Sequence, residues 1–243
     1  YNRDIEIYPV LRAMFEQIYG ECPYASPTDM GVNMAGLSIV DDEVCREASK
    51  QEIIRRYFKT ACLVRQGLAS EAELQKIENL MRQLKLEPEN RPVVPAALKR
   101  AEATGQPAAA LELPDGTIVT GRTSELLGAS SALTLNALKM LAGIPHEVKL
   151  ISPTVIAPIQ TLKTDYMQSR NPRLHTDEML VALAISAATD ENAMRAMQKL
   201  DELSGCDLHS SVILGTVDDS VFKRLGINVT CEATYEDNNL YHK

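Results

Sequence analysis

The stretch from Pro107 to Pro158 most constrains what this chain can fold into, because strand and helix signals alternate along it. Two short apolar runs, Ala108–Leu113 and Thr117–Arg122, flank the tripeptide Pro114-Asp115-Gly116. Proline fixes one φ angle and glycine accepts the positive φ that a tight turn needs, so the two runs predict a β-hairpin.

Helix and strand signals continue after the hairpin. Small residues favour helix starts at Gly128–Ser131 and Ser152–Thr154, with a strand predicted between them at Glu147–Ile151. Thr176 and Thr189 are expected to cap two further helices. The last predicted elements are a strand at Asp207–Leu214, a helix at Asp218–Leu225 and a strand at Ile227–Cys231. This alternation predicts a mixed sheet covered by helices.

The first 90 residues carry helical periodicity instead. An apolar stripe at helical spacing is formed by Val10, Leu11, Met14, Phe15 and Ile18, and it predicts a helix that packs in a bundle. Ser70 and Glu73 form the S-x-x-E pattern of a capping box. Prolines then cluster between residues 87 and 95, which indicates a linker. We therefore expect an α+β or α/β protein with a helical bundle domain at 1–90 and a mixed-sheet domain at 96–243.

Charge and cysteine content narrow the partners and the compartment. The formal net charge of -8 argues against nucleic-acid and anionic-membrane binding, and no apolar run is long enough for a bilayer. The five cysteines are scattered without a C-x-x-C pair, so neither a disulfide framework nor a zinc knuckle is expected, and a cytoplasmic location fits. Because the chain starts at Tyr1 rather than Met, we expect an N-terminal portion to be missing.

Two groups of candidate ligand-binding residues lie in the helical domain. A loop between glycines offers hydroxyl, carboxylate and amide groups at Ser26, Thr28, Asp29 and Asn33. These residues bind a ligand in one interpretation, with Asp29 as a proton carrier, and only cap turns in the other. The bases are Lys50, Arg55 and Arg56. They either clamp a phosphate or carboxylate, or form ion pairs on a solvated helix face.

The second domain offers its helix starts and one histidine. Helix N-termini attract anions, and Ser130, Ser131, Ser152 and Thr154 add hydroxyls to the two starts. Simple N-capping is the alternative. His175 precedes two acidic residues, so it is either a general base or an exposed loop residue. No H-E-x-x-H, G-x-S-x-G, G-x-G-x-x-G or P-loop pattern occurs, so neither a metal nor a cofactor is predicted.

Long runs of the chain resemble the bacterial domain-of-unknown-function family 1846, also called uncharacterised protein family 0371. The runs that carry the resemblance span essentially the whole chain and include YNRDIEIYPVLRAMFEQIYG, SPTDMGVNMAG, PDGTIVTGRTSELLGASSALTLNALKMLAGI and NPRLHTDEMLVALAISA. The resemblance implies a longer protein with an additional N-terminal α/β half that carries a P-loop-like segment. The family has no established activity to transfer.

The predicted order of elements in residues 96–243 also resembles the cytidine-deaminase fold, a three-layer architecture. That fold binds zinc through a His or Cys at the first helix start and a Pro-Cys-x-x-Cys at the second. Here the second start keeps Pro153, but Thr154 and Ala157 stand at the cysteine positions, and no glutamate follows the first start. The resemblance therefore implies a deaminase-like scaffold without zinc chemistry.

Two hypotheses follow. In the first, the chain is an enzyme or part of one that binds a small anionic metabolite, phosphorylated or nucleotide-like, at the two helix starts. The helical-domain loop and bases would then close over that metabolite, with Asp29 or His175 moving a proton. In the second, the chain is a non-catalytic structural or homo-oligomerisation module that serves the missing N-terminal half.

Overall fold

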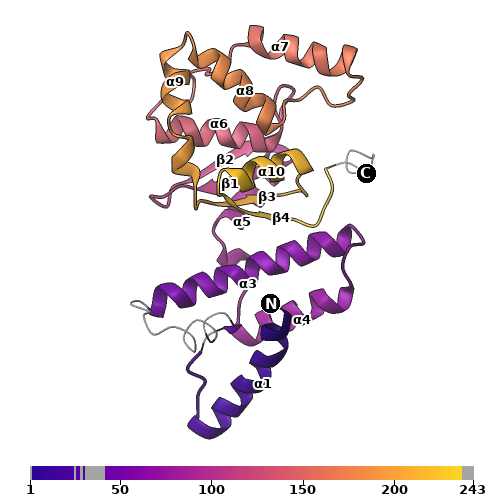
Figure 1. Ribbon diagram of the computed structural model, residues 1–243, viewed down its shortest axis with the longest axis vertical. Helices are drawn as coiled ribbons and strands as arrows, with labels where there is room; N and C mark the ends of the chain where they lie inside the picture. Colours follow the sequence, from indigo (N-terminus) through magenta and orange to yellow (C-terminus); the bar gives the residue numbers. More distant parts are fainter. Residues whose placement is uncertain (1, 25, 28–29, 31–41, 237–243) are drawn as a thin grey trace. The chain divides into compact units, whose positions relative to one another are not determined.

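The computed structural model describes residues 2–24, 26–27, 30 and 42–236, and the chain divides into the two units Tyr1–Arg91 and Pro92–Lys243 (Figure 1). The first unit contains helices alone among its described residues. The second combines helices with a mixed sheet, so the protein has the α+β character that the sequence predicts. We describe each unit by itself.

The N-terminal unit is built from long helices. These are α1 (Asn2–Tyr19), α3 (Asp42–Arg65) and α4 (Glu71–Leu84), followed by a short 3-10 turn, Pro88–Asn90. Helix α4 packs against both α1 and α3 and buries Ile77, Leu80 and Met81. Its capping box is confirmed: Ser70 Oγ accepts a hydrogen bond from the Glu73 amide at 3.4 Å, and Glu73 Oε2 accepts from the Ser70 amide at 2.8 Å.

The residues through which helix α1 contacts its unit coincide only in part with the predicted apolar stripe. Of the predicted stripe, Val10, Met14 and Ile18 are exposed, whereas Leu11 and Phe15 are half-buried. The contacts come from another side of the helix, where Tyr8 is fully buried and its hydroxyl donates to the carbonyl of Tyr24 at 2.7 Å. The stripe is covered only in part, because helical periodicity identifies an apolar face without saying which neighbour, if any, covers it.

The C-terminal unit holds a four-stranded sheet with helices on both faces. Its elements in chain order are α5 (Val93–Thr104), β1 (Ala108–Glu112), β2 (Ile118–Arg122), α6 (Ala129–Leu141), α7 (Pro153–Thr161), a π-helical turn (Leu162–Tyr166), α8 (Thr176–Ala187), α9 (Glu191–Met197), a 3-10 turn (Leu200–Leu203), β3 (Asp207–Ser210), α10 (Thr216–Arg224) and β4 (Asn228–Cys231). The strand order is β2-β1-β3-β4. Strand β1 is antiparallel to β2 and β3, whereas β3 and β4 are parallel.

The predicted hairpin is confirmed. Strands β1 and β2 pair from Ala108 with Arg122 to Glu112 with Ile118. Gly116 has φ 82°, which L side chains rarely adopt, and the carboxylate of Asp115 accepts a hydrogen bond from the Thr117 amide at 2.9 Å. That bond lowers the pKa of Asp115. The turn residues therefore fix the register of the strands from which the rest of the unit is built.

Successive residues of β1 face opposite layers. Ala109 and Leu111 belong to the main core with helices α6, α8, α9 and α10, while Ala110 packs with Val93 and Ala97 of α5. The sheet is thus the middle of three layers. On the α6 side the backbones come very close: a Cβ placed on Gly121 of β2 would lie 2.5 Å from the Cα of Leu133.

Two local predictions in this unit are wrong. Residues 147–151 form no strand: the Val148 amide donates to the Pro145 carbonyl in a turn, and Leu150 and Ile151 bury in the core without pairing. A short apolar run can be buried in this way as easily as in a strand. The helix caps are also displaced by one residue, since α8 is preceded by His175 and α9 by Asp190 at the N-cap.

Candidate functional site

The starts of three helices lie at one edge of the sheet. Strands β2, β3 and β4 run in the same direction, so their carboxyl ends share an edge with the amino end of β1. Helix α6 starts after β2 and α10 after β3, and α8 joins them because the Thr176 amide donates to Asp218 Oδ1, in the first turn of α10, at 2.8 Å. Ligands of α/β sheets usually bind at such an edge.

Leu174 holds two distant segments together at this edge. Leu127 and Leu174 form an isolated parallel bridge. The amide of Leu174 donates to the Leu126 carbonyl at 3.0 Å, and its carbonyl accepts from the Gly128 amide at 3.3 Å and from the Ser131 hydroxyl at 2.8 Å. The residues before α8 are therefore fixed against the residues before α6.

A cavity of about 730 Å³ opens beside this junction. It is lined by Thr104, Gln106, Arg122, Thr123, Ser124, Glu125, Leu126 and Arg173. The lining thus contains two arginines and one glutamate. Arg122 donates through Nη1 to the carbonyl of Thr123 at 3.2 Å, and Arg173 pairs through Nη1 with Glu236 Oε1 at 2.7 Å. Both contacts leave further guanidinium N–H groups, because each guanidinium carries five.

A buried lysine fixes the segment that carries Arg173. Lys163 lies in the π-helical turn with its side chain 6% exposed, and its ammonium donates to the Arg173 carbonyl and to Glu178 Oε2, each at 2.6 Å. The same carboxylate oxygen accepts from the His175 amide at 2.8 Å. Burying a charged group is costly unless it is paired, so this network is expected to hold one geometry.

The cavity has the chemistry of an anion site. Arginine binds carboxylate and phosphate groups through paired N–H donors. The start of α6 lies within two or three residues of the lining residue Leu126, and its N-terminal N–H groups add partial positive charge. The start of α8 adds less, because the Thr176 amide already donates to Asp218 and the Glu178 amide to Asp177.

None of the predicted site residues of this unit lines the cavity, although three of them lie close in the chain to residues that do. Ser130 and Ser131 are buried at the start of α6, and the Ser131 hydroxyl is engaged by Leu174. His175 lies two residues beyond Arg173, with Nε2 3.5 Å from the side-chain amide nitrogen of Asn171.

The start of α7 lies elsewhere. Ser152 and Thr154 are exposed and their hydroxyls are 2.6 Å apart. It is Gln160, near the other end of α7, that donates to the carbonyl of Glu125 in the cavity lining, at 3.2 Å. Six helical residues separate Thr154 from Gln160, a rise of about 9 Å. The two predicted helix starts therefore do not meet directly.

The candidates of the N-terminal unit lie in a different environment. Lys50 pairs with Glu47 at 3.3 Å, and Arg55 and Arg56 both pair with Glu52, at 2.8 and 3.2 Å. These are the i,i+3 and i,i+4 pairs typical of a helix surface. Ser26 is buried. Thr28, Asp29 and Asn33 lie outside the described residues.

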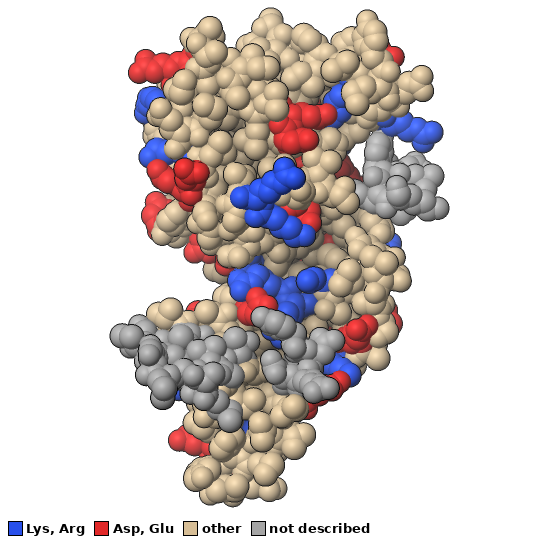
Figure 2. Space-filling model, viewed as in Figure 1, with Lys and Arg blue, Asp and Glu red and all other residues tan. Residues whose placement is uncertain are grey.

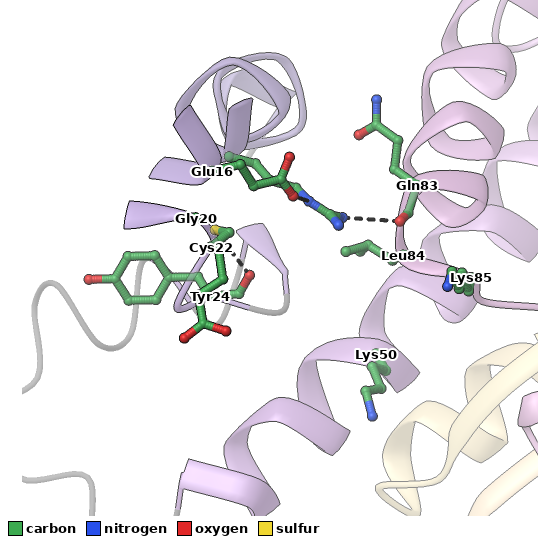
Figure 3. Close-up of a pocket in the computed structure, with 10 residues that line it drawn as sticks. Glu16, Gly20, Cys22, Tyr24, Lys50, Gln83, Leu84 and Lys85 are labelled. Atoms are coloured by element: carbon green, nitrogen blue, oxygen red, sulfur yellow. Dashed lines mark hydrogen bonds and ion pairs between the residues drawn. The ribbon is translucent and has the colours of Figure 1, made fainter. Parts of the chain in front are cut away.

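A second cavity, of about 550 Å³, lies within the N-terminal unit (Figure 3). Lys50 reaches it from α3, Gln83 and Leu84 from the end of α4, and Cys22 and Tyr24 from the segment after α1. Arg12 also lines it, but its guanidinium is engaged by Glu16 at 2.8 Å, which raises the pKa of Arg12, and by the Gln83 carbonyl at 3.0 Å. The lining carries Arg12, Lys50 and Lys85 against Glu16 and Glu21, and Lys50 is also paired with Glu47 outside the cavity lining.

Sequence reasoning missed Arg122, Arg173 and Lys163. Arg122 ends a strand and Arg173 stands in a loop, and no local pattern distinguishes either from a solvated base. Only the pairing of Leu127 with Leu174 brings them to one cavity. Among the described residues, no group of three or more His, Cys, Asp or Glu side chains is placed to hold a metal ion. Nor is any described helix long and apolar enough to cross a membrane.

Comparison with known proteins places both units in one family. The model "Domain of unknown function DUF1846, N-terminal" matches residues 1–85, and "Domain of unknown function DUF1846, C-terminal" matches residues 89–241. A UPF0371 protein of Streptococcus thermophilus (strain LMD-9) is 55% identical over 243 residues. UPF0371 proteins of Corynebacterium aurimucosum and Streptococcus pneumoniae (strain JJA) are each 54% identical, over 244 and 243 residues.

These relatives are uncharacterised bacterial proteins, and they are longer than this chain. In each case the match covers 100% of the chain but 49% of the relative, so the chain spans about half of their length. The two family models together account for nearly all of its residues. The chain belongs to the DUF1846 family of uncharacterised proteins.

Proposed function

We propose that the C-terminal unit binds a small anionic metabolite, phosphorylated or nucleotide-like, in the cavity between Arg122 and Arg173, as an enzyme or part of one. The observation that carries this proposal is the presence of two arginines in the lining of one cavity at the carboxyl edge of the sheet, close in the chain to the start of α6. The cavity volume of about 730 Å³ suits a ligand of metabolite size.

Charge favours a small anion over a nucleic acid. The formal charge of the chain is -8. On the face shown in Figure 2, Lys and Arg side chains of the C-terminal unit are interspersed with Asp and Glu, and much of the surface is uncharged. Nucleic-acid binding draws its affinity from many basic side chains along a phosphate backbone. Two arginines in a cavity match one or two anionic groups instead.

Catalysis would rest on positioning and charge stabilisation, with His175 as the proton carrier nearest the cavity. Asp29 remains a second proposed carrier. The chemistry needs no zinc, because Thr154 and Ala157 occupy the positions where the deaminase-like scaffold would carry cysteine.

Calorimetric titration tests the proposal. Inorganic phosphate, inorganic pyrophosphate and adenosine monophosphate are titrated into the chain at low ionic strength. Charge-assisted hydrogen bonds contribute about 1.5–3 kcal/mol, so Arg122→Gln and Arg173→Gln should each weaken the best probe about tenfold or more. Arg224→Gln, which removes one exposed positive charge from α10, is the matched control and should leave affinity unchanged.

A variant at the ion pair of Arg173 should have the opposite effect on the binding affinity. Glu236→Gln removes the carboxylate that competes for this guanidinium, so it should strengthen binding. Failure of all three probes to bind the wild-type chain contradicts the proposal. That result favours the alternative, a non-catalytic structural or homo-oligomerisation module, for which Val181 and Ile185 offer an exposed apolar side of α8.

A further inference from the structure

Helix α1 carries a continuous exposed apolar stripe. Its members are Ile7, Val10, Met14 and Ile18, which are 47%, 61%, 50% and 65% exposed. At about 100° per residue the four side chains fall within an arc of about 80° on one face of the helix. Isolated exposed apolar residues are ordinary on protein surfaces, but a row of four on one helix face indicates an interaction site.

The contacts that α1 makes within the N-terminal unit do not involve this stripe. Helix α1 meets its own unit through other residues: the ring of Phe15 lies 5.7 Å from the ring of Tyr24, Tyr8 is buried, and Arg12 donates to the Gln83 carbonyl of α4. These residues lie on other sides of α1. The four residues of the stripe therefore remain exposed when α1 is packed in its own unit.

We propose that the stripe of α1 is the docking face for the part of the full-length family protein that this chain does not span, through an apolar surface of that part. The matched relatives carry about as many residues again as this chain, so in proteins of their length an attached part is large enough to cover the stripe. The proposal is independent of the anion cavity, because α1 and that cavity belong to different units.

The size of the stripe favours an attached partner over a second copy. An 18-residue helix is about 27 Å long and about 10 Å wide, so one face offers on the order of 300 Å². Stable association of separate chains usually buries about 800 Å² on each partner. An attached segment has an effective concentration in the millimolar range and needs much less contact area.

The experiment is hydroxyl-radical footprinting of Met14. The 243-residue chain is compared with a full-length chimaera in which it replaces the matched half of the Streptococcus thermophilus relative. Methionine oxidation reports exposure of the sulfur. Met14 should oxidise several-fold more slowly in the chimaera than in the chain alone.

Substitutions on α1 assign the protection to the stripe. In the chimaera, Val10→Glu with Ile18→Glu should restore the Met14 rate of the chain alone, since glutamate keeps the helix but blocks apolar docking. Val181→Glu with Ile185→Glu, of similar exposure on α8, is the matched control and should leave Met14 protected. Equal Met14 rates in chimaera and chain overturn the proposal. So does protection that appears in the chain alone as its concentration rises and dimers form, because the occupant is then a second copy.

Discussion

Replacing Gly121 of β2 with alanine should destabilise the C-terminal unit. A Cβ at this position would lie 2.5 Å from Cα and 2.8 Å from Cβ of Leu133, and closer still to its amide nitrogen. These are backbone atoms of α6 or atoms fixed to them, so no side-chain rotation relieves the clash. Helix α6 must move away from β2.

The magnitude follows from overpacking. Inserting a methyl group into a packed core costs about 1–3 kcal/mol, and a clash with backbone lies at the upper end, about 3 kcal/mol. For a unit of this size that corresponds to a fall in melting temperature of roughly 6–12 °C. Because α6 carries Ser131 and follows Gly128, which hold Leu174 and hence the segment of Arg173, anion affinity should fall as well.

Urea unfolding followed by circular dichroism measures the stability. Amide hydrogen exchange of α6 peptides assigns the loss to the C-terminal unit. Gly215→Ala is the control: Gly215 has φ -65° and no atom within 4 Å of the place that an alanine Cβ would take, so it should cost only the preference of a helix N-cap for glycine over alanine, about 1 kcal/mol or less. If Gly121→Ala unfolds within about 0.5 kcal/mol of wild type, the close packing of α6 on β2 is refuted.

Three further predictions concern single groups. Ser131→Ala removes the hydroxyl donor to the Leu174 carbonyl and should cost about 1 kcal/mol in urea unfolding; a cost near zero would mean that the bond is absent. The Thr117 amide lowers the pKa of Asp115, so its stabilisation of the turn is present above the usual carboxyl pKa and lost as pH falls through the lower folded value. Amide hydrogen exchange of the hairpin should become faster as the pH falls through that value. In Asp115→Asn this pH dependence should be absent. Burial raises the pKa of the Cys206 thiol, so at pH 8 it should alkylate more slowly than an unburied cysteine; a fast Cys206 in mass spectrometry would contradict its burial.

Features encoded by neighbouring residues could be predicted from the sequence. The capping box of Ser70 and Glu73 and the turn at Asp115 and Gly116 each depend on a few adjacent residues, and both are found as expected. The strand predicted at 147–151 is wrong because the length of this apolar run fits a strand and a buried turn equally well. Its apolar residues entered the core without strand pairing.

The candidate site depends on long-range contacts, which local patterns do not contain. Arg122 and Arg173 are far apart in the sequence and meet only through the bridge between Leu127 and Leu174. The hydroxyl of Ser131, predicted to bind ligand, instead helps to hold that bridge. One of the two predicted helix starts, at Gly128–Ser131, follows the lining residue Leu126 closely in the chain, but no local pattern indicated the charged groups of the cavity.

The most direct test of the anion site is the location of binding rather than its strength. Amide chemical shifts of the isotope-labelled chain are followed while inorganic pyrophosphate is added at low ionic strength. We expect the largest shifts in two segments, residues 123–128 and 173–176, with saturation at a single affinity. Shifts confined to residues of the N-terminal unit, or none in either segment at saturating pyrophosphate, would contradict the anion site.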